Sequence, residues 1–297
     1  MTAFVQDVVN ALSLGSVYAL VALGISLQFG IMKLINFAHG ELIMIAGYTL
    51  VAFGGHVWLL AVFAAVAAAG VAAVVMERVA FRPVRGSDPS TMLVTSFAVS
   101  VLLQSLAIFA LGAQSRPIVW PGFVGDSLHV FGIQLQLLDL IGIAVAALAL
   151  AAVSLFLFRT SAGVQMRAVA EDFGMARHVG VRANRTVATA FGLSGVLAGL
   201  AGAIYLAQTA SVNPTVGLQI VVVGFVASVL GGISSLRGAV VGGLLLGALT
   251  VALQVVLPES VRGARDAFVL LIVLGVLVLR PQGLFGDRAV FGPLGRS

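Results

Sequence analysis

The sequence predicts an all-α polytopic membrane protein with about eight or nine transmembrane helices, broken or re-entrant segments and an internal inverted repeat. Of its 297 residues, 60% are hydrophobic and only 9% are charged, and the mean hydropathy is +1.14. Soluble domains carry about 25% charged residues because their surface must be wetted. Long apolar runs separate the charges, and roughly 20 apolar residues cross a hydrocarbon core about 30 Å thick. Polar residues interrupt the apolar pattern once in each half of the chain, which is typical of transport proteins built from repeats.

The apolar runs predict nine spans within a single transmembrane domain that covers residues 1–297. The expected spans are 8–30, 40–55, 58–76, 91–113, 137–158, 187–207, 217–234, 239–257 and 266–280. Because each span uses about 20 residues, the loops are short and leave no room for a sizeable domain outside the membrane.

The arginines predict the orientation of these spans. Most of them lie in the connections 77–90 and 159–186 and in the C-terminal tail: Arg78, Arg82, Arg85, Arg159, Arg167, Arg177, Arg182, Arg185, Arg280, Arg288 and Arg296. Arginine is enriched in cytoplasmic loops, so we expect these segments and the C-terminus inside, and nine spans then place the N-terminus outside. The connection 258–265 departs from this pattern, because it is expected outside and yet contains Arg262 and Arg265.

The composition also narrows the class of function. The chain has no cysteine, so we expect neither a disulfide framework nor a thiolate metal site, and we predict no metal site. It has no Gly-Lys-Ser/Thr sequence, so we expect no phosphate-binding P-loop, and we predict no catalytic residue. The net charge of +5 comes from arginines clustered between apolar runs. This arrangement reflects membrane topology, so we expect the lipid bilayer as a partner and no nucleic acid.

Glycines spaced four residues apart predict close helix packing. Three such pairs occur: Gly195 and Gly199, Gly238 and Gly242, and Gly243 and Gly247. Helices in lipid associate through close backbone approach over small residues, since no hydrophobic force drives them together. We therefore assign these pairs to helix contacts.

The tetrapeptide Gly192-Leu193-Ser194-Gly195 resembles the nucleophile motif of rhomboid intramembrane proteases. A serine nucleophile needs a base within hydrogen-bond reach. None of the four histidines, at 39, 56, 129 and 178, lies in a later apolar span where such a base is expected. We therefore predict that Ser194 serves helix packing and not catalysis.

Two segments look interrupted by polar residues. The first, GIMKLINFAHG at 30–40, is followed at once by Glu41, and the second is GGISSLRGAVVGG at 231–243. Charged groups at membrane depth are costly and mark pathways, cavities or helix ends. Our candidates for a substrate pathway or gate are Lys33, Asn36, His39, Gly40, Glu41, Gly231, Gly232 and Ser234. Two alternatives stay open: tight cytoplasmic turns at both segments, and a structural cluster of Lys33, His39 and Glu41.

The connection 159–186 contains a short amphipathic pattern. Met166, Val169, Ala170 and Phe173 recur at helical spacing, with charged residues on the remaining faces. We expect Gly174 to end this helix, and a second short piece to run from Met175 to Gly180. Such a segment suits docking into a groove on another protein, and the alternative is a helix that lies on the membrane surface.

Four blocks in this order resemble the branched-chain amino acid ABC transporter permeases of the LivH type. They are GISLQFGIMKLINFAHGELIMIAGY, MRAVAEDFGMARHVGVRANRTVATAFGLSGVLAGLAGAIY, GFVASVLGGISSLRGAVVGGLLLGAL and LRPQGLFG. The likeness runs from about 14 to 286, and NFAHGE and RPQGLFG are specific to it.

The resemblance implies an inner-membrane permease subunit of a bacterial binding-protein-dependent ABC importer. It implies three kinds of partner, four chains in all: a second, LivM-like permease, two cytoplasmic ATP-binding subunits and a periplasmic substrate-binding protein. ATP and magnesium would bind to the ATPase subunits, and no cofactor is expected on this chain. It also assigns 159–186 as the loop that docks on an ATPase, with the matching residues Arg167, Ala168, Glu171, Asp172, Ala176 and Gly180.

The substrate implied is a branched-chain amino acid or a related small solute. Relatives with similar motifs import urea, short amides or aromatic acids, so these solutes stay as alternatives. An alternative of another class is a stand-alone channel or secondary transporter, in which Glu41 and His39 would relay protons.

Overall fold

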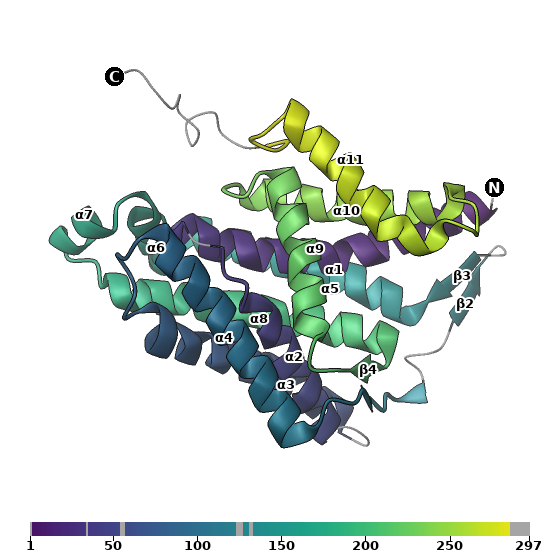
Figure 1. Cartoon of the computed structure of the whole chain (residues 1–297), viewed down its shortest axis with the longest axis horizontal. Helices are drawn as coiled ribbons and strands as arrows, with labels where there is room; N and C mark the ends of the chain where they lie inside the picture. The colour runs from purple at the N-terminus through teal and green to yellow at the C-terminus, as the bar shows by residue number, and fades with distance from the viewer. Residues whose placement is uncertain (1, 34, 54–56, 123–126, 131–132, 286–297) are drawn as a thin grey trace.

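The computed structural model describes residues 2–33, 35–53, 57–122, 127–130 and 133–285, and this part of the chain is mainly helical (Figure 1). Six of its helices are long and apolar enough to cross a membrane. They are α1 (Thr2–Met32), α3 (Trp58–Met76, continued by the π-helix η1 at Glu77–Phe81), α4 (Pro89–Leu111), α5 (Leu137–Arg159), α8 (Ala183–Thr209) and α10 (Leu236–Val256). The predicted class of an all-α membrane protein is confirmed at this level.

Three further predicted spans correspond to shorter helices. Helices α2 (His39–Phe53) and α9 (Val216–Gly231) are apolar but have 15 and 16 residues, and α11 (Arg265–Leu279) has 15. Figure 1 shows α9 running across α1 rather than alongside it. Every predicted span therefore overlaps a helix, but the count of eight or nine crossings and the inverted repeat are not confirmed. Arg288 and Arg296 of the predicted tail, and His56, lie outside the described residues.

Small elements connect the helices at the two ends of the molecule. Helices α6 (Ser161–Glu171) and α7 (Phe173–His178) lie at one end, and two strand pairs lie toward the other (Figure 1). Strand β1 (Arg116–Pro117) pairs antiparallel with β4 (Ser211–Val212), and β2 (Ser127–Val130) with β3 (Ile133–Gln136). The turn η3 (Arg262–Ala264) precedes α11.

The glycine pairs lie at helix contacts, as predicted. A Cβ on Gly195 of α8 would lie 2.5 Å from the carbonyl oxygen of Ala69 in α3, and one on Gly199 would lie 2.8 Å from the Cα of Val66. Gly243 and Gly247 of α10 meet α1 in the same way, and Gly238 and Gly242 meet the end of α9. Side chains at these positions would force the backbones apart, so small residues set the spacing of the bundle.

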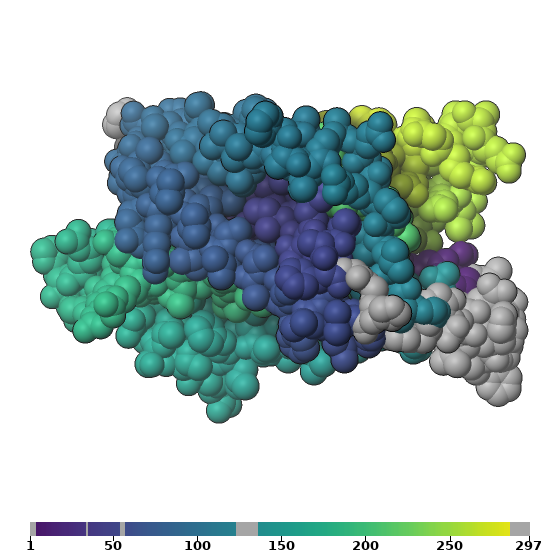
Figure 2. Space-filling model, turned by 90° about the horizontal axis from the view of Figure 1, so that it is seen from below, coloured from purple at the N-terminus to yellow at the C-terminus, as the bar shows by residue number. Residues whose placement is uncertain are grey.

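Helix α4 is apolar on its outer surface. The exposed fraction is 92% for Phe109, 65% for Val94 and 57% for Leu102. Figure 2 looks onto this side of the molecule, where α3 and α4 (blue) form the outer layer. An exposed apolar surface of this kind faces lipid or another apolar protein surface.

Candidate functional site

The segment predicted to dock on another protein forms two capped helices. Thr160 caps α6, with its Oγ1 accepting a hydrogen bond from the amide of Gly163 (3.1 Å), and the carboxylate of Asp172 accepts one from the amide of Met175 (2.9 Å) to cap α7. The predicted break at Gly174 is wrong, because Asp172 has an extended backbone that separates the helices and Gly174 lies inside α7. The polar N-cap Asp172, and not Gly174, sets the boundary between the two helices. Gly180 adopts φ +88° just after α7, where the second piece was predicted to stop.

This segment is anchored on one side and exposed on the other. Met166, Val169 and Ala176 are buried, whereas Met175 and Val179 are 61% and 75% exposed. Of the remaining predicted coupling residues, Ala168 is half-buried, and four are exposed: Arg167, Glu171, Asp172 and Gly180. Figure 2 shows the green segment that includes α7 projecting at one end of the molecule. The amphipathic pattern is therefore confirmed, with apolar side chains left on the outer surface.

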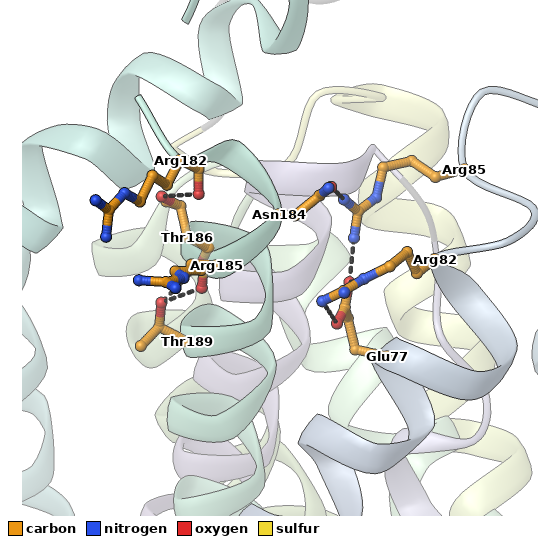
Figure 3. A network of polar contacts seen from close by, with 8 residues as sticks. All are labelled: Glu77, Arg82, Arg85, Arg182, Asn184, Arg185, Thr186 and Thr189. Carbon is orange, nitrogen blue, oxygen red and sulfur yellow. Dashed lines mark hydrogen bonds and ion pairs between the residues drawn. The ribbon is translucent and has the colours of Figure 1, made fainter. Parts of the chain in front are cut away.

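A buried carboxylate binds two arginines of the loop that follows α3, and one of them reaches α8 (Figure 3). Glu77, at the start of η1, is fully buried and pairs with Arg82 (Nη2 to Oε2, 2.9 Å) and with Arg85. Arg85 also donates to Oδ1 of Asn184 in α8 (2.7 Å), and its guanidinium lies 5.3 Å from the ring centroid of Phe173 in α7. Burial lowers the pKa of the Arg85 guanidinium from its ordinary value, and the Glu77 carboxylate opposes that shift. We call Glu77, Arg82, Arg85, Asn184 and Phe173 the Glu77 clamp.

This clamp was not predicted from the sequence, where Arg82 and Arg85 served only as markers of topology and Glu77 had no assigned role. The available signal was one acidic residue at the end of an apolar run, five and eight positions before two arginines. The π-helical turn that brings them together has no clear sequence signature, and such turns are frequent at functional sites.

The first interrupted segment places its polar residues against different helices. Lys33 follows α1 in a left-handed conformation (φ 53°), and Asn36 donates from Nδ2 to Oε1 of Gln28 (2.9 Å). Oε1 of Glu41 accepts hydrogen bonds from Ser100 and Gln104 of α4, both at 2.8 Å.

Gly40, at the start of α2, packs against Gly217 at the start of α9. A Cβ on Gly217 would lie 2.5 Å from the carbonyl oxygen of Gly40. The two short helices therefore begin against each other. Among the described residues, no hydrogen bond or ion pair joins Lys33, His39 and Glu41 to one another, and their role in a pathway or gate stays a prediction.

The expectation that no histidine approaches Ser194 is wrong. Nδ1 of His39 lies 3.2 Å from Oγ of Ser194, which also donates to the carbonyl of Gly24 (3.1 Å). The sequence could not show this, because α2 begins within the bundle beside α8. Both side chains are fully buried, so the pair forms a polar contact between α1, α2 and α8 with no surface open to a peptide substrate.

The second interrupted segment is a tight turn between α9 and α10. Gly232 adopts φ +109°, and Ser235 begins α10 by accepting a hydrogen bond from the amide of Gly238 (3.1 Å). The amides of Leu284 and Phe285 donate to the carbonyls of Leu230 and Gly231, both at 2.9 Å. The C-terminal block RPQGLF therefore satisfies the free carbonyls at the end of α9, which a helix otherwise leaves unpaired.

A cavity of about 600 Å³ lies at the arginine-bearing end of the molecule, the end that carries the connections 77–90 and 159–186. This volume is within the range of small-molecule sites. The cavity lies between the end of α1, α5, α6 and the turn before α10. Lys33 and Ser234 from the predicted pathway line it, together with Arg167 and Glu171 from the predicted coupling loop. The structure thus brings members of both predicted sets, far apart in the sequence, to one cavity.

These features define a class: a polytopic helical membrane protein with a capped amphipathic segment at its arginine-bearing end. The profile of the family described as "branched-chain amino acid transport system / permease component" matches residues 8–279. The chain belongs to this family of permease components. No solved structure matches it.

Full-length relatives agree with this assignment. The high-affinity branched-chain amino acid transport system permease protein BraD of Pseudomonas aeruginosa is 34% identical, with 97% of each chain covered. The permease proteins LivH of Escherichia coli K12 and Salmonella typhimurium are 34% and 33% identical, again over 97% of each chain.

Proposed function

We propose that this chain is a permease subunit of an ABC importer that carries branched-chain amino acids across the inner membrane. The observation that carries the proposal is the near-complete alignment with BraD and LivH, whose names state this activity. ATP would be hydrolysed on two separate ATP-binding subunits, and a LivM-like permease and a periplasmic binding protein would complete the system. The arginine-bearing end, with the C-terminus, would face the cytoplasm.

The segment α6–α7 would dock on an ATP-binding subunit. Its exposed Met175 and Val179 give an apolar surface, and Arg177 lies between them in the sequence. A short amphipathic helix of this kind binds in a groove of a partner protein. The contact between Phe173 and Arg85 links α7 to the Glu77 clamp, so a displacement of α7 would be passed to α3 and α8.

The cavity at the same end would be the cytoplasmic mouth of the pathway. Arg167 and Glu171 of α6 line it beside Lys33 and Ser234. A movement of α6 driven by the ATPase would therefore change the walls of the cavity directly. This arrangement couples docking to access without chemistry on this chain.

The test is to purify the tagged chain from its native host in mild detergent and to reconstitute what co-purifies. We expect two ATP-binding subunits and a second permease, and ATP hydrolysis stimulated by leucine-loaded binding protein more than by urea, a short amide or an aromatic acid. Uptake that collapses with an uncoupler at constant ATP, from a chain that purifies alone, would instead establish the secondary transporter.

A further inference from the structure

A second cavity, of 430 Å³, lies between α1, α8, α9, α10 and α11. Arg265 lines it. This residue is one of the two arginines in the connection 258–265, which is expected outside although arginine is enriched in cytoplasmic loops. In Figure 1, α11 begins at the end of the molecule opposite to α7. The volume lies within the about 300–1,000 Å³ that is usual for small-molecule sites.

Polar side chains from four different helices line this cavity. They are Tyr18 of α1, Tyr205 of α8, Gln219 of α9 and Thr250 of α10. Thr250 donates to the carbonyl of Leu246 (2.7 Å), whereas Tyr18, Tyr205 and Gln219 have no side-chain hydrogen bond to another described residue. Polar groups within membrane helices are costly unless they are paired or line a pathway. Their convergence from four helices therefore indicates a polar ligand.

A cation and an anion lie side by side at the start of α11. Nη2 of Arg265 is 3.1 Å from Oδ1 of Asp266, and Nη1 of Arg265 donates to Oε1 of Gln254 (2.9 Å). The two charged side chains are 31% and 82% exposed. An exposed pair is weak and exchanges partners readily. A zwitterion, with a carboxylate and an ammonium on one carbon, is complementary to such a pair.

The remaining lining is aliphatic. It comprises Ile220, Val222, Val223 and Val226 of α9, Leu246 of α10, and Val269 and Leu270 of α11. We propose that this cavity is a transit site for a zwitterionic amino acid with a branched aliphatic side chain. The carboxylate binds Arg265, the ammonium binds Asp266, and the side chain packs against α9 and α11. The identity of the solute rests on the proposed function, and the location of the site rests on the cavity alone.

The first test compares Arg265→Gln with the control Arg262→Gln in the reconstituted complex. Arg262 lies three positions away and pairs with Glu259 (3.9 Å) at an exposed position. We expect Arg265→Gln to lower the number of leucine molecules imported per ATP about ten-fold, as for loss of one charged hydrogen bond to a ligand. Arg262→Gln should keep the wild-type ratio. Normal import by Arg265→Gln would overturn the transit site and leave the importer assignment intact.

The second test locates the solute without measuring transport. The chain has no cysteine, so Val223→Cys gives one thiol of this subunit in the cavity, and Leu274→Cys on α11 gives an exposed control outside it. Labelling by a small methanethiosulfonate is followed on this chain during ATP turnover with binding protein, with and without leucine.

Leucine should slow labelling at position 223 several-fold and not at position 274, and the added change Arg265→Gln should abolish the protection. Equal labelling with and without leucine, in a complex that imports leucine, overturns the site. A wild-type complex that imports no branched-chain amino acid overturns the proposed function instead, and with it the solute assigned here.

Discussion

Glu77 and Glu41 are both fully buried carboxylates, but their partners differ in kind. Glu77 lies where α3 leaves the bundle and pairs with two arginines, whose side chains are 38% and 14% exposed. Glu41 lies in the first turn of α2, inside the bundle, and is hydrogen-bonded by the neutral side chains of Ser100 and Gln104.

The difference follows from where a cation can be placed. An arginine at the end of the bundle keeps part of its guanidinium in water while it binds a buried acid, so its desolvation cost is limited. Deep between helices the same arginine would be fully desolvated, and neutral donors stabilise the acid at lower cost. The arginines around Glu77 therefore fix the loop that contacts α7, whereas the neutral partners of Glu41 orient α2 against α4.

The largest expected loss of stability is at the Glu77 clamp. Glu77→Gln removes the counter-charge of two arginines, and breaking such a buried pair costs about 3–5 kcal/mol. We expect the lower part of this range because Arg82 is partly solvated. Thermal unfolding of the purified complex measures the loss, with Glu259→Gln as the control.

Glu259 is 92% exposed and faces Arg262 at 3.9 Å, so its substitution should leave the melting temperature unchanged. Equal effects of the two substitutions would contradict the view that burial makes the Glu77 clamp stabilising.

A smaller loss of stability is expected where Glu41 accepts its hydrogen bonds from Ser100 and Gln104. Glu41→Ala leaves the Ser100 hydroxyl and the Gln104 amide without their acceptor, which costs about 1–3 kcal/mol. Glu41→Gln keeps an acceptor at Oε1 and should cost less than Glu41→Ala. Leucine uptake by Glu41→Gln at normal expression then decides the role of the charge: unchanged uptake makes Glu41 structural, and lost uptake places it in the pathway.

Ser194→Ala tests another neutral contact inside the bundle. It removes the hydrogen bond from α8 to the carbonyl of Gly24 in α1 and the contact with His39 of α2. Each is a net loss of about 0.5–1.5 kcal/mol, and we expect leucine uptake to stay near the wild-type rate. An activity of the purified chain against peptide substrates that disappears in Ser194→Ala would restore the protease interpretation.

The sequence predicted what periodicity and composition control. Nine apolar runs all became helices, and the glycine pairs lie at the contacts that their spacing indicated. The connection 159–186 was predicted to contain an amphipathic helix because Met166 and Val169 recur at helical spacing, and both side chains are buried in the structure. These features depend on residues close together in the chain.

The residues that the sequence analysis misplaced depend on contacts between distant segments. His39 reaches Ser194 across 155 positions, and Arg85 reaches Asn184 across 99. Neither contact follows from local spacing, because each depends on where α2 begins and how η1 turns. The C-terminal block RPQGLFG was recognisable as a motif in the sequence. Its hydrogen bonds to the end of α9, made by the amides of Leu284 and Phe285, became visible only in the folded structure.

The smallest expected change in stability is at the outer edge of the Glu77 clamp. Phe173→Leu removes the ring beneath Arg85. The ring is half-buried and the Arg85 side chain is 14% exposed, so we expect a loss of about 1 kcal/mol, between the values for exposed and for desolvated cation–π pairs, and only a small change in melting temperature. We expect the leucine imported per ATP to fall nonetheless, because this ring is the link between α7 and the arginine that binds α3 and α8.

Phe173→Trp should restore that ratio, because tryptophan offers a larger face to the guanidinium. A purely structural ring would give the opposite pattern, with stability lost and the ratio of leucine to ATP unchanged. A leucine variant that couples normally would mean that the arginines around Glu77 fix the loop without passing movement from α7. Glu77 and Glu41 would then both serve only to hold helices together, and they would differ only in how much each contributes to stability.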